Sequence, residues 1–106
     1  PDPAIERALD AIPAKQVARI VVRMKVADAK AGDSCQFFWQ MGSSPASETT
    51  MLRLPVIPGN QFHDYLFEVG AHRQWRGRIN KLRFDPVNQR DVTVTVEGIR
   101  LMPASE

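Results

Sequence analysis

The chain has 106 residues, of which 43% are apolar and 25% are charged, and its net charge is +2 at pH 7. These are ordinary values for a globular domain, and they exclude a largely disordered chain. The small net charge produces no strong overall electrostatic field that would attract nucleic acid. No apolar run approaches the ~20 residues of a membrane-spanning helix. We therefore expect neither a nucleic-acid partner nor a membrane span.

A chain of 106 residues has the length of one domain. It begins at Pro1 without an initiator Met or a signal-peptide pattern, and it ends at Glu106 shortly after a strong strand pattern. We therefore expect residues 1–106 to be a single domain cut from a longer protein. Cys35 is the only cysteine, which excludes an intrachain disulfide and a Cys-pair metal or redox site but leaves the cellular compartment open.

Most of the chain alternates apolar and polar residues with a period of two, which predicts strands. The first residues are ambiguous: Ile5–Leu9, between Pro3 and Pro13, is predicted to be a short edge strand, with one helical turn as the alternative. Six further runs follow along the chain. Their predicted inward residues are Ile20, Val22, Met24 and Val26; Cys35, Phe37, Trp39 and Met41; Leu52, Leu54 and Val56; Tyr65, Phe67 and Val69; Leu82 and Phe84; and Val92, Val94 and Val96.

Turn signals separate these runs, and one phase change interrupts the last of them. The turns are predicted at residues 31–33, 42–45, 58–60, 70–72 and 85–88. At Gly98 the alternation shifts, so that Ile99 and Leu101 follow Val96 on the inward side, which predicts a β-bulge. Six or seven short strands with one apolar face each predict an all-β fold, a two-sheet antiparallel β-sandwich of jelly-roll type.

A series of motifs in the second half carries a family resemblance. The motifs are Phe62-His63-Asp64-Tyr65, Trp75-Arg76-Gly77-Arg78-Ile79, Leu82-Arg83-Phe84-Asp85-Pro86 and Val96-Glu97-Gly98-Ile99-Arg100-Leu101. Together with earlier segments such as Phe37-Phe38-Trp39-Gln40, this order resembles the galactose-binding-like jelly rolls attached to bacterial carbohydrate-active enzymes. The resemblance spans about Pro3 to Leu101. It implies a non-catalytic carbohydrate-binding module, although the same fold class also hosts protein binders and structural appendages.

The sequence offers little that would support catalysis. Cys35 with His63 or His72 is a conceivable nucleophile and base. Cys35 is in phase with apolar neighbours, however, and free cysteines are usually buried, so we expect it in the core. The chain contains no G-x-S-x-G elbow, Walker loop or H-E-x-x-H motif, and we expect no enzymatic activity.

We expect no metal and no other cofactor. The spacing of His63, Asp64 and His72 matches no metal-binding signature. Members of the wider class that the chain resembles often hold a structural calcium ion. Glu97 stands where many of those relatives have Asp, so we do not expect calcium here.

Five basic residues crowd a short stretch that contains no acid. They are Arg73, Arg76, Arg78, Lys81 and Arg83. One interpretation is a patch for an anionic polysaccharide or phosphate, because the guanidinium fork matches such groups. The other is a solvated face whose cations pair with Asp85, Asp91 and Glu97.

The aromatic residues divide into core and surface candidates. Trp39 and Tyr65 are predicted to be core residues, with the Tyr65 hydroxyl bonded locally. Phe38 is out of phase with the core and is predicted on the outer face of a sheet. Trp75 precedes a strand beside Gly77, and it is either a platform for a sugar ring or a plug for the end of the sandwich.

The resulting hypothesis is a carbohydrate-binding module that binds an oligo- or polysaccharide and lies beside the domains of its parent enzyme. The predicted ligand-binding residues are Trp75, Arg76, Arg78, His63 and Gln40. The alternative is a structural or protein-interaction domain that docks on its parent enzyme or a partner and binds no sugar. An exposed aromatic in a concavity would favour the first, and a flat apolar patch the second.

Overall fold

The computed structural model describes residues 5–30, 32–42, 50–86 and 92–103, with the backbone alone for residues 5–11. Parts of the predicted turns and Asp91 lie outside these residues. The described residues form seven strands and two short 3₁₀ turns: β1 (Ile5–Pro13), η1 (Ala14–Gln16), β2 (Arg19–Ala27), β3 (Ser34–Met41), β4 (Met51–Pro55), β5 (Phe62–Phe67), η2 (Val69–Ala71), β6 (Arg78–Asp85) and β7 (Thr93–Met102). The predicted N-terminal strand is confirmed and is longer than expected, and the helical alternative is wrong.

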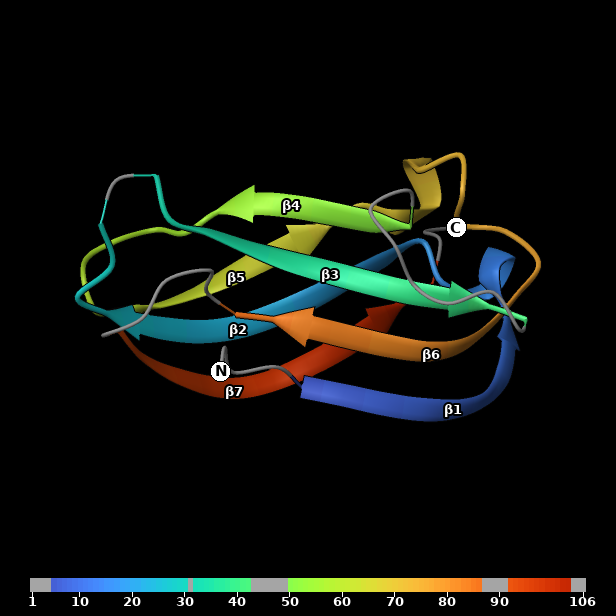
Figure 1. Cartoon of the computed structure of the whole chain (residues 1–106), viewed down its shortest axis with the longest axis horizontal. Helices are drawn as coiled ribbons and strands as arrows, with labels where there is room; N and C mark the ends of the chain where they lie inside the picture. The colour runs from blue at the N-terminus through green and yellow to red at the C-terminus, as the bar shows by residue number, and fades with distance from the viewer. Residues whose placement is uncertain (1–4, 31, 43–49, 87–91, 104–106) are drawn as a thin grey trace.

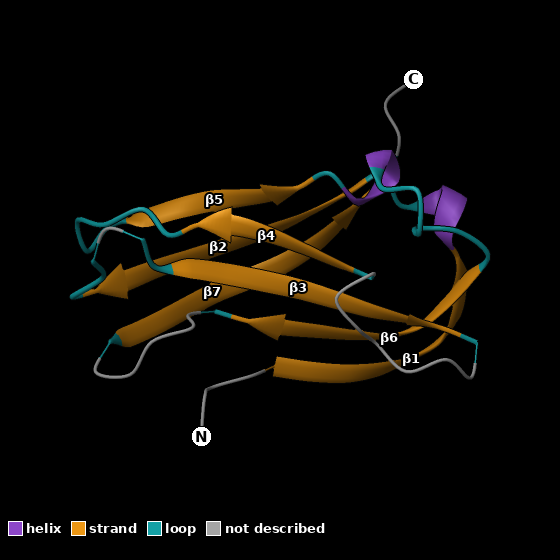
Figure 2. Ribbon diagram, turned by 45° about the horizontal axis from the view of Figure 1, so that its top comes forward, coloured by secondary structure: helices purple, strands orange, loops and turns teal. Residues whose placement is uncertain are grey.

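The strands form two antiparallel sheets packed face to face, as the strand patterns predict (Figure 1). One sheet has the order β1-β6-β3-β4, and the other has the order β5-β2-β7. Among the described strands, only β3 and β4 are neighbours both in sequence and within a sheet. Figure 2 shows both 3₁₀ turns at the same end of the sandwich, where the chain passes between the layers. The fold is therefore an all-β sandwich.

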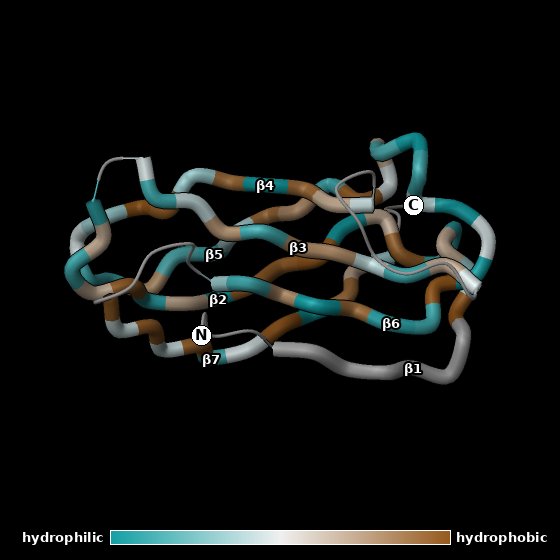
Figure 3. The backbone as a smooth tube through the Cα atoms, viewed as in Figure 1, coloured by the Kyte–Doolittle hydropathy of each residue, from teal (hydrophilic) through white to brown (hydrophobic). Residues whose placement is uncertain are grey.

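The core lies between the sheets and contains most of the predicted inward residues. The others are partly buried and pack against it: Met41, Leu52, Leu54, Val92, Val94 and Val96. The fully buried side chains of β2 and β3 fall at every second position, and Figure 3 shows hydropathy that varies along these strands. Three phenylalanines meet at the centre: the Phe37 ring lies 5.4 Å from Phe67 and 5.8 Å from Phe84, between ring centroids. Because burial of such rings supplies much of the stability of a small domain, this cluster joins the two sheets.

The last strand bends at the predicted position. Gly98 pairs with Arg23 while Val96 pairs with Met24, so one extra residue of β7, Glu97, forms a β-bulge. The bulge brings Ile99 and Leu101 onto the inward face, in register with Val22 and Ile20.

Ile99 and Leu101 lie on the inward side of their sheet, as predicted, but they are not buried. Ile99 is 36% exposed and Leu101 is 41% exposed, whereas their partners Val22 and Ile20 are fully buried. The difference arises because β7 is the outermost strand of its sheet and β2 is the central one.

Candidate functional site

Trp75 lies in the segment between η2 and β6, at the end of the sandwich that carries both 3₁₀ turns. Its side chain is only 7% exposed. The indole Nε1–H donates to the carbonyl oxygens of Ala14 at 2.8 Å and Val17 at 2.9 Å. Because those carbonyls belong to the connection from β1 to β2, the ring fastens that connection and fills the end of the sandwich. This burial fits the plug interpretation and leaves little of the ring for a sugar to stack on.

Trp39 supports this arrangement from β3. Its ring meets Trp75 edge-on at 5.2 Å and His72 edge-on at 4.9 Å, between centroids. Its Nε1–H donates to the carbonyl oxygen of Gln74 at 3.1 Å, and His72 Nδ1 accepts the backbone N–H of Gln74 at 3.0 Å. Trp39 is fully buried, as predicted. The side chains of Trp39 and His72 therefore bind the backbone of Gln74 at its carbonyl oxygen and at its N–H, which fixes the segment that carries Trp75.

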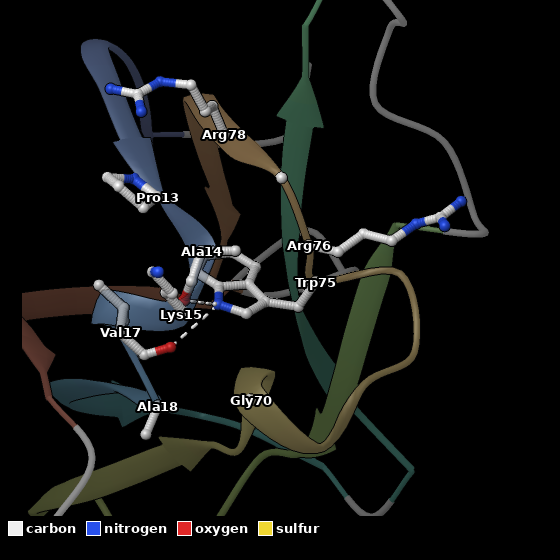
Figure 4. Close-up of a pocket in the computed structure, with 10 residues that line it drawn as sticks. Pro13, Ala14, Lys15, Val17, Ala18, Gly70, Trp75, Arg76 and Arg78 are labelled. Carbon is white, nitrogen blue, oxygen red and sulfur yellow. Dashed lines mark hydrogen bonds between the residues drawn. The ribbon is translucent and has the colours of Figure 1, made fainter.

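A concavity of about 750 Å³ opens beside the Trp75 ring (Figure 4). Pro13, Val17 and Trp75 contribute apolar surface to it, and the exposed residues Lys15 and Arg78 also line it. Lys15 is a residue that the sequence did not single out. The residues next to Lys15 in the sequence form no ligand-binding pattern. Lys15 lies at the concavity because the turn η1 places it there.

The segment Arg76-Gly77-Arg78 borders this concavity and also a second hollow of about 480 Å³ on its other side, next to Met41 and Gly42. Gly77 has a φ of +69°, a conformation that residues with a side chain rarely adopt. Its carbonyl oxygen accepts the N–H of Ala14 at 2.8 Å. Figure 4 shows the side chains of Arg76 and Arg78 extending to opposite sides of this segment.

The remaining two predicted site residues lie elsewhere. Gln40 is near the end of β3, and its Nε2 donates to the carbonyl oxygen of Gly42 at 3.4 Å, so it adjoins the second hollow. His63 pairs with Met24 near the beginning of β5. Figure 1 shows that β5 begins at the opposite end of the sandwich from the start of β6. The structure therefore gathers Trp75, Arg76 and Arg78 at one end with Gln40 nearby, and it places His63 far from them.

The basic stretch of the sequence divides between two surfaces. Arg83 lies on the outer face of the four-stranded sheet, where its guanidinium group binds both carboxylate oxygens of Asp85 at 2.9 and 3.2 Å. The same group lies 5.5 Å from the centroid of the Phe38 ring, which lies on the outer face as predicted but is half-buried rather than exposed. This part of the stretch is a solvated face, in agreement with the second interpretation. Arg73, Arg76 and Arg78 belong to the end of the sandwich instead.

Glu97, an expected partner of these cations, pairs elsewhere. Its carboxylate accepts Arg23 Nε–H at 2.7 Å, and Asp64 binds the same guanidinium group at 3.2 Å. These two hydrogen-bonded carboxylates raise the pKa of Arg23 above its ordinary value.

Two further side chains are structural, as the sequence predicts. Tyr65 is buried, and its hydroxyl oxygen accepts the N–H of Ile57 at 2.9 Å, while burial raises its pKa. Cys35 is fully buried, and desolvation raises the pKa of its thiol to about 12. The thiol is therefore protonated and sealed in the core, where it cannot serve as a nucleophile.

Neither a metal cluster nor a membrane-spanning helix is found in the part of the chain that the structure describes. No three His, Cys, Asp or Glu residues of that part gather closely enough to hold a metal ion. No helix in it has the length and apolar character needed to cross a membrane.

The architecture defines the protein as an antiparallel β-sandwich with a basic concavity at one end of its two sheets. Comparison with protein-family models, curated proteins and solved structures gave no match. What the chain does must therefore be inferred from this concavity and from the chemistry of the residues around it.

Proposed function

We propose that this domain is a non-catalytic carbohydrate-binding module of a larger protein that builds or degrades polysaccharide. The observation that carries the proposal is the concavity of about 750 Å³ between η1 and the segment 75–78. Its volume lies within the range of roughly 300–1,000 Å³ that is typical of small-ligand sites. A site of this size accommodates one or two sugar rings of a longer chain.

The chemistry of the walls suits a sugar. A sugar ring has an apolar C–H face and a rim of hydroxyl groups, so its site needs apolar surface beside polar donors. Here Pro13 and Val17 offer the apolar surface, while Lys15, Arg76 and Arg78 offer charged donors. Trp75 also lines the concavity, and by binding the carbonyls of Ala14 and Val17 it keeps the wall formed before a ligand arrives.

The test is a glycan-array screen of the 106-residue chain beside a double variant, Arg76→Ala with Arg78→Ala. Both side chains are exposed, so circular dichroism should show an unchanged fold. We expect binding to a defined set of glycans that is lost in the double variant and retained in Arg53→Ala, which removes an exposed cation from β4. Unchanged binding by the double variant would place the site elsewhere, and no binding by the parent chain would reject the proposed function.

A second function, docking on a parent enzyme or partner, is favoured by a different observation. Leu66 on β5 and Leu101 on β7 are exposed, and a groove of about 330 Å³ runs past Leu52, Leu54 and Ala71 between β4 and β5. Exposed apolar surface of this kind is common at protein interfaces. Hydrogen exchange would test it: docking predicts that β5 and β7 exchange more slowly in the full-length protein than in the isolated domain.

A further inference from the structure

The strands β4 and β5 form one long side of the sandwich. Each is the outermost strand of its sheet, and Figure 1 and Figure 2 show them next to each other along that side. The groove of about 330 Å³ lies between them. Leu52, Arg53 and Leu54 form its wall on β4, while Leu66 and Phe67 of β5 belong to the opposite wall. Two sheet edges therefore border one groove.

Backbone groups of β4 point out of its sheet along this side. In an antiparallel pair, the N–H and C=O groups of alternate residues point toward the partner strand, and those of the residues between them point away. The carbonyl oxygen of Thr50 accepts the N–H of Trp39 in β3 at 3.1 Å. The alternation that starts at Thr50 turns the N–H and C=O groups of Met51 and Arg53 away from β3. Because β4 pairs with no other described strand, these groups form an open ladder edge.

The side chains of β4 alternate between the groove and the outer face of the sheet. Leu52 and Leu54 pair with buried residues of β3 and are themselves partly buried against the core, so they face inward. Arg53 lies between them, is exposed, and forms no ion pair with another described residue. On an added strand, the residues directly opposite these three would share their faces. The edge therefore suits an apolar residue, an acid and a second apolar residue in succession.

We propose that the open edge of β4 binds an extended peptide of a partner protein as an additional strand, with the pattern apolar–acidic–apolar opposite Leu52, Arg53 and Leu54. The added strand lies about 4.8 Å from β4. Its apolar side chains enter the groove, and its acid lies beside Arg53 on the outer face. This specifies the docking function described above and rests on it, and it does not depend on sugar binding.

Two alternatives fit less well. A second copy of the chain offers this edge no acid, because the residues of β4 on the outer face are Met51, Arg53 and Pro55. Pairing of β4 with itself would therefore place no opposite charge beside Arg53. Residues 99–101 of β7 also have an apolar–cationic–apolar pattern. The bulge at Glu97 interrupts the ladder of β7, however, whereas β4 pairs with β3 in one continuous register.

The test uses synthetic peptides and the 106-residue chain. The first peptide alternates valine with threonine and carries glutamate in place of its central threonine. One matched peptide has lysine there, and another has N-methyl groups on the backbone edge that would face β4. We expect the glutamate peptide to shift the amide signals of Met51 and Arg53 and to slow their hydrogen exchange. The lysine peptide should bind about threefold or more weakly, and the N-methylated peptide about tenfold or more weakly.

A charge reversal locates the edge. In Arg53→Glu the preference should invert, so that the lysine peptide binds more tightly than the glutamate peptide. The matched control is Arg100→Glu, which reverses an exposed cation on β7, the outermost strand at the other side of the sandwich, and should leave the order of affinities unchanged. Circular dichroism should show that both variants keep the fold. Equal effects of the two reversals would mean that overall charge governs binding and that the assigned edge is wrong.

The remaining outcomes separate this inference from docking itself. Equal binding of the N-methylated peptide would overturn strand addition. Dimerisation of the chain without peptide, with slow exchange at β4, would make a second copy the occupant and overturn the proposed partner. Slow exchange of β5 and β7 but not of β4 in the full-length protein would leave docking standing and reject this binding mode. Absence of slow exchange in all three strands, together with no binding of any peptide, would reject both.

Discussion

At the scale of single residues, three buried polar side chains bind the backbone. Asp33, 4% exposed, accepts the backbone N–H of Lys30 at 2.9 Å and closes the turn before β3. The Tyr65 hydroxyl and the Trp75 indole bind backbone groups of connections that have no strand partner. A buried polar group that lacked such a partner would cost about 1–3 kcal/mol, so these bonds decide how the loops lie.

Cys35 gives a prediction at this scale. Because its thiol is fully buried and its folded-state pKa is about 12, the thiolate forms far more readily in the unfolded chain. A folded-state pKa above the unfolded value favours the native state below about pH 8.5, and this contribution is lost as the pH rises toward 12. We therefore expect stability in urea to fall more steeply above about pH 9 in the parent chain than in Cys35→Ala.

Thiol labelling offers the accompanying measurement for Cys35. At about pH 8 a thiol reagent should modify the native protein only as fast as it unfolds, and it should modify the urea-unfolded chain at once. Rapid labelling of the native protein, faster than its unfolding rate, would show that the thiol is accessible and that its assignment to the core is wrong.

At the scale of elements, two glycines differ in how closely other chain segments approach them. Gly70 in η2 packs against the chain just before β2: its N–H donates to Ala18 O at 2.8 Å. A Cβ atom at position 70 would lie 2.9 Å from that oxygen and 3.1 Å from the Ala18 Cα. Gly98 in the β7 bulge has open space around it, with nothing within 4 Å of an added Cβ.

These two positions make a matched pair. Gly70→Ala is expected to destabilise the protein by about 1–3 kcal/mol, because backbone on both sides must shift to admit the methyl group. Gly98→Ala should change stability by less than about 0.5 kcal/mol, because the added Cβ meets nothing. Urea unfolding of both variants tests this. A similar cost at both sites would mean that the bulge, rather than the contact with Ala18, controls tolerance.

At the scale of the whole molecule, Trp39 and Trp75 connect parts that are distant in sequence. Trp39 belongs to the four-stranded sheet, while the carbonyls that Trp75 binds precede β2 of the other sheet. The edge-on contact of the two rings at 5.2 Å joins these parts at the end where the concavity opens. The wall of the proposed site and the packing of the two sheets therefore depend on the same pair of rings.

Replacing Trp75 tests this dependence. Trp75→Phe keeps an aromatic ring but removes the donor to Ala14 and Val17, and we expect a loss of about 2–3 kcal/mol. The unfolding curves from Trp fluorescence and from far-ultraviolet circular dichroism should still coincide, because the two sheets unfold together. Phe38→Leu, on the outer face, should cost less than about 1 kcal/mol. Two separate transitions in either variant would show that the sheets are not coupled.

Much of this architecture follows from local pattern. The period of two along the strands, the turn residues between them and the phase change at Gly98 each depend on a few neighbouring residues, so the β-sandwich and its bulge were predictable. The same applies to Cys35, Trp39 and Tyr65. Their positions in the alternating pattern assign them to the inner face of a strand, and this assignment does not depend on which residues pack against that face.

The sequence by itself determined the strands, their inward faces and the bulge, because these depend on short-range periodicity and backbone preference. Only the tertiary structure decided that Lys15 joins Arg76 and Arg78 around one concavity, that His63 lies at the other end, and that Ile99 and Leu101 stay exposed. These outcomes depend on which strand lies at an edge and which connections meet at one end of the sandwich. Such long-range placement is set by the packing of the two sheets, and no spacing along the chain records it.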